Sequence, residues 1–397
     1  MKQRKRRVNG EGTWGEKNIN GLHYYFFRNS EGKYFYGKTQ KEVDEKRQLK
    51  EKKIIKVTNK MTFGEYVKKW LYERKYEEVG ITIQSTTFDT YEDALNRRFF
   101  KDNISNCQLG SLNNRQINAY LKSLAEKYSR ASIHKTWVIL KMALQDTDAD
   151  GHELIPELNY AKIFVPTESN VAKKKKKVNY TTKEDMDKLY IEAFRKTSRD
   201  TFYYSDASKL LVFIMYSGLR LSEGCGLKWK NVDLENEIIS IKQQTTKIRI
   251  RNEDGESIGY KVVDKDVKTV ASVRDIPYLK RAGEVLQLMY NKGQHRPDDY
   301  VFTTSNGRPY TRKTVEKTLN RMLNCANCST MDYTIHSLRH GYGSVLYENG
   351  VDLKTISELL GHNDISTTAN IYVGVSANTL KDAINKVNKI IEEPPEE

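Results

Sequence analysis

The chain of 397 residues is long enough for two or three domains, and it carries 67 Lys and Arg against 52 Asp and Glu, a formal net charge of +15. A surplus of this size indicates a polyanionic partner, either nucleic acid or an acidic membrane surface. The apolar run Leu210–Tyr216 has only seven residues, whereas a membrane-spanning helix needs about 18. Four cysteines are too few for a disulfide framework, so we expect a reducing, cytoplasmic location.

Positive charge is concentrated near the N-terminus. Residues 1–56 hold 16 Lys and Arg against 7 Asp and Glu, which is more than half of the whole excess. A solvated basic surface would have the same composition, but the concentration favours a footprint for nucleic-acid phosphates. Residues 1–8 are expected to be a disordered basic arm, and its candidate DNA-binding residues are Lys2, Arg4, Lys5, Arg6 and Arg7.

Short aromatic segments follow this arm and predict a small sheet. Tyr and Phe suit a pleated surface, and residues 29–32 (NSEG) make a turn between two such segments. Thr39 can cap a charged helix at 41–55. One aromatic face must form a core because strand side chains alternate, which leaves the other face for a DNA groove. Residues 1–58 are thus predicted to be a small α+β domain with strands near 13–14 and at 21–28 and 33–36.

Residues 59–166 are predicted to be an all-α domain. Phe63, Val67 and Trp70 recur with the spacing of one helical face, and similar patterns return three times along the segment. The apolar faces would pack together as a small bundle. The four predicted helices are 63–71, 87–99, 113–128 and 132–147.

A polar stretch at 167–179 (TESNVAKKKKKVN) has no apolar periodicity and predicts an interdomain linker. Its lysines either belong to a solvated tether or cross DNA phosphates, and they are Lys173, Lys174, Lys175, Lys176 and Lys177. Residues 180–397 are predicted to be mainly helical. The expected strands of this domain are 238–241, 248–251, 260–263 and 274–277.

Two segments of this last domain place an arginine three residues from another functional side chain. In SGLRLSE (217–223), Arg220 and Glu223 share a helical face, and a surface ion pair is the alternative interpretation. In HSLRH (336–340), His336 and Arg339 have the same spacing. Arginine offers a planar fork of donors to phosphate oxygens, and histidine can transfer a proton near neutral pH. The alternative for the second segment is a helix start with a capping histidine.

Two further segments complete the set. In LLGH (359–362), Gly361 suits a helix C-terminus, and Ser366 can cap a following helix that presents Tyr372 about two turns in. A single tyrosine among 25 is by itself more often part of a core than a nucleophile. The fourth segment is 268–277 (KTVASVRDIP), in which Lys268 lies where one strand turns toward the next.

Together, the order of Arg220, Lys268, HSLRH, LLGH and Tyr372 resembles the catalytic signature of the tyrosine recombinases, also called the phage integrase family. The N-terminal segment is similar to that of integrases from conjugative transposons of Gram-positive bacteria. The resemblance implies a multidomain fold: an arm-type DNA-binding domain (1–58), a helical core-binding domain (59–166) and a mainly α catalytic domain with a small antiparallel sheet (180–397). Gly341 departs from the family, which often has Thr or Ser there.

The resemblance also implies a role for each residue. Tyr372 would attack the scissile phosphate to give a 3′-phosphotyrosine, which saves the bond energy for resealing. Arg220 and Arg339 would stabilise the charged transition state, and His362 would add a hydrogen bond. Lys268 would protonate the leaving 5′-oxygen, although the lysines at 261, 265 and 280 lie nearby. His336 would act as acid or base, and Glu223 would position Arg220.

With these cations in place of a divalent ion, we expect neither a metal nor a nucleotide cofactor. The lone CxxC of Cys325 and Cys328 predicts no zinc site. The implied partners are double-stranded DNA at core and distal arm sites, further copies of the chain (a tetramer in the synapse) and an accessory excision factor. An apolar stripe at 376–391 predicts a C-terminal helix that docks either on its own domain or on a neighbouring protomer.

The predicted function is that of a site-specific integrase that inserts and excises a mobile element through a Holliday junction. Three alternative functions have to be distinguished from it. A type IB topoisomerase has similar chemistry but acts without chosen sites. A Xer-type chromosome-dimer resolvase is expected to lack the basic aromatic N-terminal domain. A non-catalytic DNA-binding protein would need the charge but not the phosphate-directed residues, and only the enzymes would trap a covalent DNA adduct.

Overall fold

The computed structural model describes residues 13–19, 22–28, 34–44, 60–146, 158–173, 180–252, 255–266, 272–362 and 364–372. The chain divides into two compact units. The first comprises residues 1–176 together with 248–261, and the second comprises 177–247 together with 262–397. The basic arm, the lysines at 174–177, Lys268 and the predicted C-terminal helix therefore lie outside the described residues, and only Lys173 of the linker lysines is described, on the surface.

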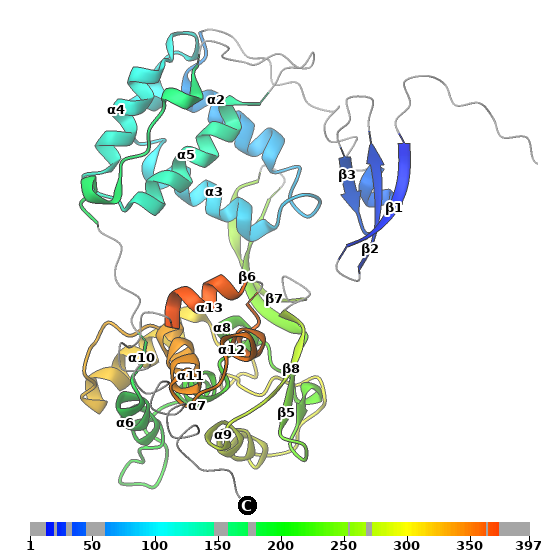
Figure 1. Ribbon diagram of the computed structural model, residues 1–397, viewed down its shortest axis with the longest axis vertical. Coiled ribbons are helices and arrows are strands. Elements are labelled where there is room, and N and C mark those ends of the chain that lie inside the picture. The colour runs from blue at the N-terminus through cyan, green and yellow to red at the C-terminus, as the bar shows by residue number, and fades with distance from the viewer. Residues whose placement is uncertain are drawn as a thin grey trace, which may run out of the picture. The chain divides into compact units, whose positions relative to one another are not determined.

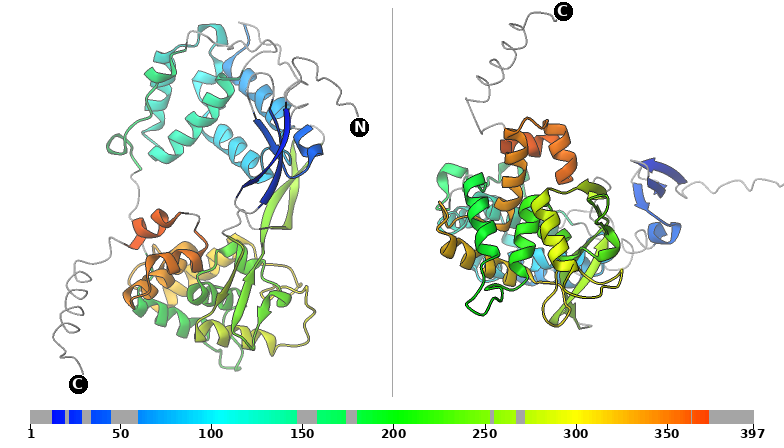
Figure 2. Two further views of the ribbon diagram at one scale, coloured as in Figure 1. Left: turned by 45° about the vertical axis from the view of Figure 1, so that its right-hand side comes forward. Right: turned by 90° about the horizontal axis from the view of Figure 1, so that it is seen from below.

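A three-stranded antiparallel sheet opens the described chain, in the order β1-β2-β3 (Figure 1). Phe27 is buried against Trp14, with the ring centroids 5.4 Å apart. A helical turn at 40–44 lies beside the sheet (Figure 2) and buries Val43, and Thr39 accepts a hydrogen bond from the Glu42 amide (3.2 Å). The predicted strands are confirmed, and of the predicted helix at 41–55 only residues 41–44 are described. The strands are β1 (Thr13–Ile19), β2 (Leu22–Arg28) and β3 (Tyr34–Gly37).

The opposite face of this sheet carries exposed aromatic rings. Phe26 pairs with Tyr36 across β2 and β3, so both side chains point to the same face. The rings of Tyr34 and Tyr36 stack at 5.8 Å, and both side chains are exposed. Arg28 lies over the Tyr34 ring at 5.4 Å. This face therefore combines aromatic surface with a cation.

Residues 60–146 form the predicted helical bundle. Thr62 and Asn113 each begin a helix with a reciprocal side-chain and backbone cap. The bundle core includes Trp70, Phe99 and Leu140, all at most 1% exposed. The helices are α2 (Phe63–Lys69), continued by a π-helical turn (Trp70–Lys75), α3 (Ser85–Arg98), α4 (Asn114–Leu124) and α5 (Arg130–Leu144). Helix α4 ends four residues before the predicted position. Short 3₁₀ turns occur at Asn103–Asn106, Leu109–Ser111, Tyr160–Lys162 and Glu168–Asn170.

A hairpin tip, 248–261, belongs to the same unit as these helices. Arg251 donates to Glu92 through both terminal nitrogens (2.9 and 2.8 Å) and to Asp89 (2.5 Å). Arg249 donates to Asp93 (2.6 Å) and also to Glu92. We call these five side chains the α3 ion cluster. Its two arginines and three carboxylates come from parts of the chain about 160 residues apart in sequence.

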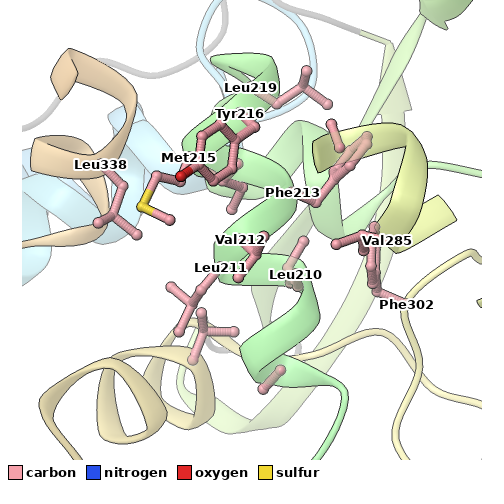
Figure 3. Close-up of a cluster of buried hydrophobic side chains, with 14 of the residues drawn as sticks. Leu210, Leu211, Val212, Phe213, Met215, Tyr216, Leu219, Val285, Phe302 and Leu338 are labelled. Carbon is pink, nitrogen blue, oxygen red and sulfur yellow. The ribbon is translucent and has the colours of Figure 1, made fainter. Parts of the chain in front are cut away.

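The second unit is built around α7, whose residues are all buried. Its helices are α6 (Lys183–Ala193), α7 (Ala207–Ser217), α8 (Leu221–Cys225), α9 (Lys280–Tyr290), α10 (Arg312–Ala326), α11 (Ile335–Glu348), α12 (Leu353–Leu360) and α13 (Ile365–Tyr372). Leu338 of α11 packs on one side of α7, and Val285 of α9 with Phe302 packs on another (Figure 3). The uninterrupted apolar run 210–216 gives most of this helix apolar side chains on every side, and such a run must be buried in this way.

Two antiparallel sheets complete the unit. Strands β4 (Val232–Asp233), β5 (Ile238–Ile241) and β8 (Arg274–Pro277) form the first, and Ile239 and Ile276 from its neighbouring strands are in the core. Strands β6 (Gln243–Arg251) and β7 (Ser257–Asp266) form the second, a hairpin longer than predicted, whose tip at 248–261 is the part that belongs to the first unit. A 3₁₀ turn, Trp229–Asn231, precedes β4. In the part of the chain that the structure describes, no helix has the length and apolarity of a membrane span. The predicted fold class, helical domains with small antiparallel sheets, is confirmed.

Candidate active site

A buried carboxylate lies at the centre of the site. Glu223 is in α8, and Arg220 immediately precedes this helix. The Glu223 carboxylate accepts a hydrogen bond from the Arg220 amide (2.9 Å) and another from Arg220 Nη1 (2.6 Å). The Glu223 side chain is 2% exposed and that of Arg220 is 31% exposed. The pair is therefore not a surface ion pair, because its acid is in the interior.

Helix α11 contributes the second arginine. Thr334 caps this helix, which removes the alternative that His336 is the cap. Arg339 is 2% exposed, and its terminal nitrogens donate to the carbonyl oxygens of Gly218 (Nη1, 2.8 Å) and Leu360 (Nη2). Its Nη1 is also 3.9 Å from Glu223 Oε2. Arg339 thereby ties together the ends of α7 and α12.

A third arginine, which was not predicted to be part of the site, also binds the same carboxylate. Arg274, the first residue of β8, donates from Nη2 to Glu223 Oε2 (3.0 Å) and from Nη1 to Oε1 (3.3 Å). The only feature of the sequence that could have indicated Arg274 as a site residue is its position in the KTVASVRDIP segment, close to Lys268. We call Glu223, Arg220, Arg274 and Arg339 the Glu223 cluster.

The charge balance of the Glu223 cluster sets the ionisation of its acid. Burial alone would raise the pKa of the Glu223 carboxyl, but the charges of Arg274, Arg220 and Arg339 outweigh burial and hold this pKa below its ordinary value. The acid is ionised at neutral pH. Three positive charges then surround a single negative one, and the excess positive potential suits an anion such as a phosphodiester.

A cavity of about 660 Å³ opens beside the Glu223 cluster. His336 is exposed on its wall, yet the protein packed around the ring lowers the pKa of this histidine, and the charges of Arg339, Arg312 and Arg220 lower it further. His336 is therefore neutral at pH 7 and can accept a proton. The cationic residues that line the cavity are Arg220, Lys247, Arg312 and Lys313. Lys247 was not among the lysines considered from the sequence.

Helix α12 ends as predicted at Gly361, which has a φ of 65°. The Nδ1 atom of the next residue, His362, and the Thr368 hydroxyl share a hydrogen bond (2.9 Å). Burial lowers the pKa of His362 to about 4, with further contributions from the nearby arginines. The imidazole is therefore neutral, and its Nδ1 is fixed by Thr368 of α13.

The expected cap of α13 was wrong. The helix begins at Ile365, and the Asp364 carboxylate accepts a hydrogen bond from the Ser366 amide (2.8 Å). A carboxylate accepts more strongly than a hydroxyl at this position, where the helix dipole favours negative charge. Tyr372 is the last residue of α13, two turns from its start as predicted. Lys268 remains a sequence prediction, because residues 267–271 lie outside the described part.

Gly341, the departure from the family pattern, has a structural reason. A Cβ atom at this position of α11 would lie 2.7 Å from the Thr181 carbonyl oxygen. The Thr181 amide in turn donates to the Ser337 carbonyl (3.2 Å), so the segment before α6 lies directly on α11. A residue larger than glycine would push this segment away from the helix.

Comparison with known proteins identifies the architecture. A model described as the phage integrase family matches residues 179–379. The chain belongs to this family. A Caldanaerobacter subterraneus protein named tyrosine recombinase XerC-like is 29% identical over 94% of this chain and 97% of its own length. The integrase of Staphylococcus phage L54a is 24% identical over 86% of this chain and 99% of its own length.

Solved structures share the fold. The Tn1549 transposon integrase in complex with a circular intermediate DNA has a TM-score of 0.63 at 20% identity, over 82% of this chain and 99% of that one. A lambda integrase dimer bound to a core site has a TM-score of 0.53 at 17% identity, over 94% of this chain and 96% of that one. The recombinase is thus a site-specific enzyme of the tyrosine type that acts on DNA.

Proposed function

We propose that this recombinase integrates and excises a mobile genetic element by cleaving and rejoining DNA through a 3′-phosphotyrosine and a Holliday junction. The observation that carries the proposal is the Glu223 cluster, with three arginines around one buried carboxylate beside a cationic cavity. The similarity to the Tn1549 transposon integrase supports a mobile element as the source of the substrate.

In the proposed cleavage step, the Tyr372 hydroxyl oxygen forms a bond to the scissile phosphorus, and the bond from phosphorus to the 5′-oxygen breaks. The tyrosine proton passes to His336, and Lys268 gives its proton to the departing 5′-oxygen. A free tyrosine has a pKa of about 10, so proton removal is needed, and a neutral His336 can accept it. Resealing runs the same transfers in reverse when a 5′-hydroxyl attacks.

The non-bridging oxygens gain negative charge in this step and need preorganised donors. Arg220 faces the cavity and would bind them directly. Arg339 would join it by exchanging a carbonyl partner for a phosphate oxygen. His362, with Nδ1 held by Thr368, would present its other ring nitrogen to the same phosphate.

The N-terminal sheet would bind distal arm sites on DNA. Its exposed aromatic face with Arg28 and the basic residues of the arm support this role, as does the concentration of charge in residues 1–56. The lysines at 173–177 would cross phosphates between the two DNA-binding regions. We further propose assembly as a tetramer on paired sites, an accessory excision factor and action in the cytoplasm.

The test is a suicide DNA substrate, on which a nick lets the 5′-product leave and traps the covalent adduct. The wild-type protein should form the adduct, and Tyr372→Phe should bind DNA equally well and form none. Tyr333 and Tyr342 are the control variants, since both are buried and the pKa of Tyr342 is raised to about 12 by burial. An adduct of normal yield from Tyr372→Phe would refute the nucleophile.

Two activity assays separate the competing functions. A topoisomerase would relax supercoiled plasmids without a chosen site, whereas the proposed integrase would recombine only paired sites. Deletion of residues 1–60 should abolish binding to distal sites and leave core-site cleavage intact. If the shortened protein still protects every site from nuclease, the arm function is wrong and a Xer-type reaction at one class of site becomes the better description.

A further inference from the structure

Arg274 is placed to act on the site without touching DNA. Its side chain is only 7% exposed. Besides the two contacts with Glu223, it donates from Nε to the Leu359 carbonyl (2.9 Å) and from Nη1 to the Ser272 carbonyl (3.1 Å). Four of the roughly five N–H donors of a guanidinium are therefore directed at protein acceptors.

The contrast with Arg220 is clear. Arg220 lines the cavity and is 31% exposed, so a phosphate can approach it. Arg274 does not line the cavity, and its fork joins two regions of chain that are far apart in sequence. One is Glu223, the carboxylate that also holds Arg220, and the other is the Leu359 carbonyl near the end of α12.

Arg274 also packs closely against Gly361, in the turn that follows α12. A Cβ atom at Gly361 would lie 2.8 Å from Arg274 Nη1, so the guanidinium lies against the main chain of the turn that precedes His362. The same Gly361 carbonyl accepts a hydrogen bond from Arg220 Nη2 (2.6 Å). Arg274 and Arg220 thus both donate hydrogen bonds to carbonyl oxygens of the 359–361 turn.

We propose that Arg274 is a positioning residue of the recombinase, which fixes Arg220 through Glu223 and fixes His362 through the 359–361 turn. The inference rests on the proposed cleavage reaction. Lysine could not replace it, because an ammonium group is a point charge and cannot bridge both Glu223 oxygens and the Leu359 carbonyl at once. A displacement of about 1 Å in such a site can cost about 10²-fold in rate.

The variant that tests this is Arg274→Lys, with cleavage followed on the suicide substrate under single-turnover conditions. We expect the cleavage rate to fall about 10- to 100-fold while core-site affinity stays within about twofold. Arg281→Lys is the matched control. Arg281 is a partly exposed arginine of the same unit, paired with Asp187 of another helix, and its substitution should leave the rate unchanged.

A second substrate distinguishes positioning from general damage to the fold. In a methylphosphonate at the scissile position, a methyl group replaces one charged oxygen, so less positive charge is needed in the transition state. If Arg274 positions Arg220, the rate ratio of wild type to Arg274→Lys should shrink on this substrate, as it should for Arg220→Ala measured alongside. An equal loss on both substrates, or a normal rate on phosphate, would overturn the inference.

Folding is checked by urea unfolding of Arg274→Lys and of Arg274→Gln, which keeps a donor for Leu359. If both variants are unfolded at the assay temperature, Arg274 is a structural residue and the inference fails. If the wild type itself forms no adduct, the proposed function fails. A wild-type adduct together with an unimpaired Arg274→Lys variant rejects the positioning role alone.

Discussion

Two groups of arginines and carboxylates, each around a buried glutamate, form the same kind of ion pair with opposite charge balance. In the α3 ion cluster of the first unit, two arginines face three carboxylates. In the Glu223 cluster of the second unit, three arginines face one carboxylate. Both have short hydrogen bonds and central residues that are less than a tenth exposed.

The charge balance determines how much positive potential each cluster leaves for an anion. Arg251, 5% exposed, has its charge matched by Asp89 and Glu92, so the α3 ion cluster has no positive potential left for a ligand. The Glu223 cluster keeps an excess of two positive charges, and its least buried arginine, Arg220, faces a cavity. Counting buried salt bridges would miss this difference, since a buried pair by itself says little about stability or function.

Between the two clusters, the largest effect on cleavage should come from Arg220→Ala. Removing one preorganised donor from an oxyanion site typically costs about 10²–10³ in rate, and we expect a loss of this size in single-turnover cleavage. The matched variant in the other cluster, Arg249→Ala, should cleave at the wild-type rate. Near-normal cleavage by Arg220→Ala would refute the phosphate-binding role and remove the distinction between the two clusters.

The reverse pattern is expected for stability when the α3 ion cluster is broken. Arg251→Met leaves the buried Glu92 without its main partner, and such a loss costs about 3 kcal/mol or more. Hydrogen exchange in α3 should report this as lower protection, while cleavage by the folded protein is retained. Unchanged protection of α3 would show that this cluster does not stabilise the first unit.

Local signals in the sequence predicted much of the site. The three-residue spacing in HSLRH correctly put His336 and Arg339 on one helix. The spacing in SGLRLSE correctly predicted that Arg220 lies beside Glu223, but the shared helical face was wrong, because Arg220 is the extended residue that caps α8. Gly361 was correctly predicted as a helix end, because a left-handed C-terminal residue has a clear preference for glycine. These features depend on neighbours within a few residues.

Contacts over long sequence distances could not be predicted. The Arg274–Glu223 pair joins residues 51 apart, and Arg339 binds the Gly218 carbonyl across 121 residues. Arg251 and Asp89 are 162 residues apart. A charged side chain in a loop or strand carries no local sign of such a partner, so Arg274 looked like an ordinary strand residue until the fold brought it to Glu223.

A smaller effect is expected at Thr368, which is buried and fixes His362 Nδ1. Thr368→Val keeps the shape and removes the hydroxyl, and a net hydrogen bond is worth about 1 kcal/mol. Cleavage should therefore fall about fivefold to tenfold with DNA affinity unchanged. Thr318→Val, which removes an exposed hydroxyl in α10, is the control. Equal rates for both variants would mean that His362 needs no orienting partner.

The smallest effect concerns pH and distinguishes the two units. Burial lowers the pKa of both His340 and His362 to about 4, against about 6.5 for an unfolded histidine. Between these values the unfolded chain binds more protons than the folded one, so stability falls as pH falls from about 6.5. In the first unit, Glu92 has a lowered pKa, so its contribution to stability is present above about pH 4.5 and is lost only below that pH.

On going from pH 7 to pH 5, hydrogen-exchange protection corrected for intrinsic rates should therefore fall in α11 and stay constant in α3. His340→Gln should reduce the fall in α11, because it removes one of the three histidines with a lowered pKa, the others being His336 and His362. Equal losses of protection in both helices would show that the second unit is no more sensitive to acid than the first. The lowered histidine pKa values near the cationic site would then have no measurable effect on stability.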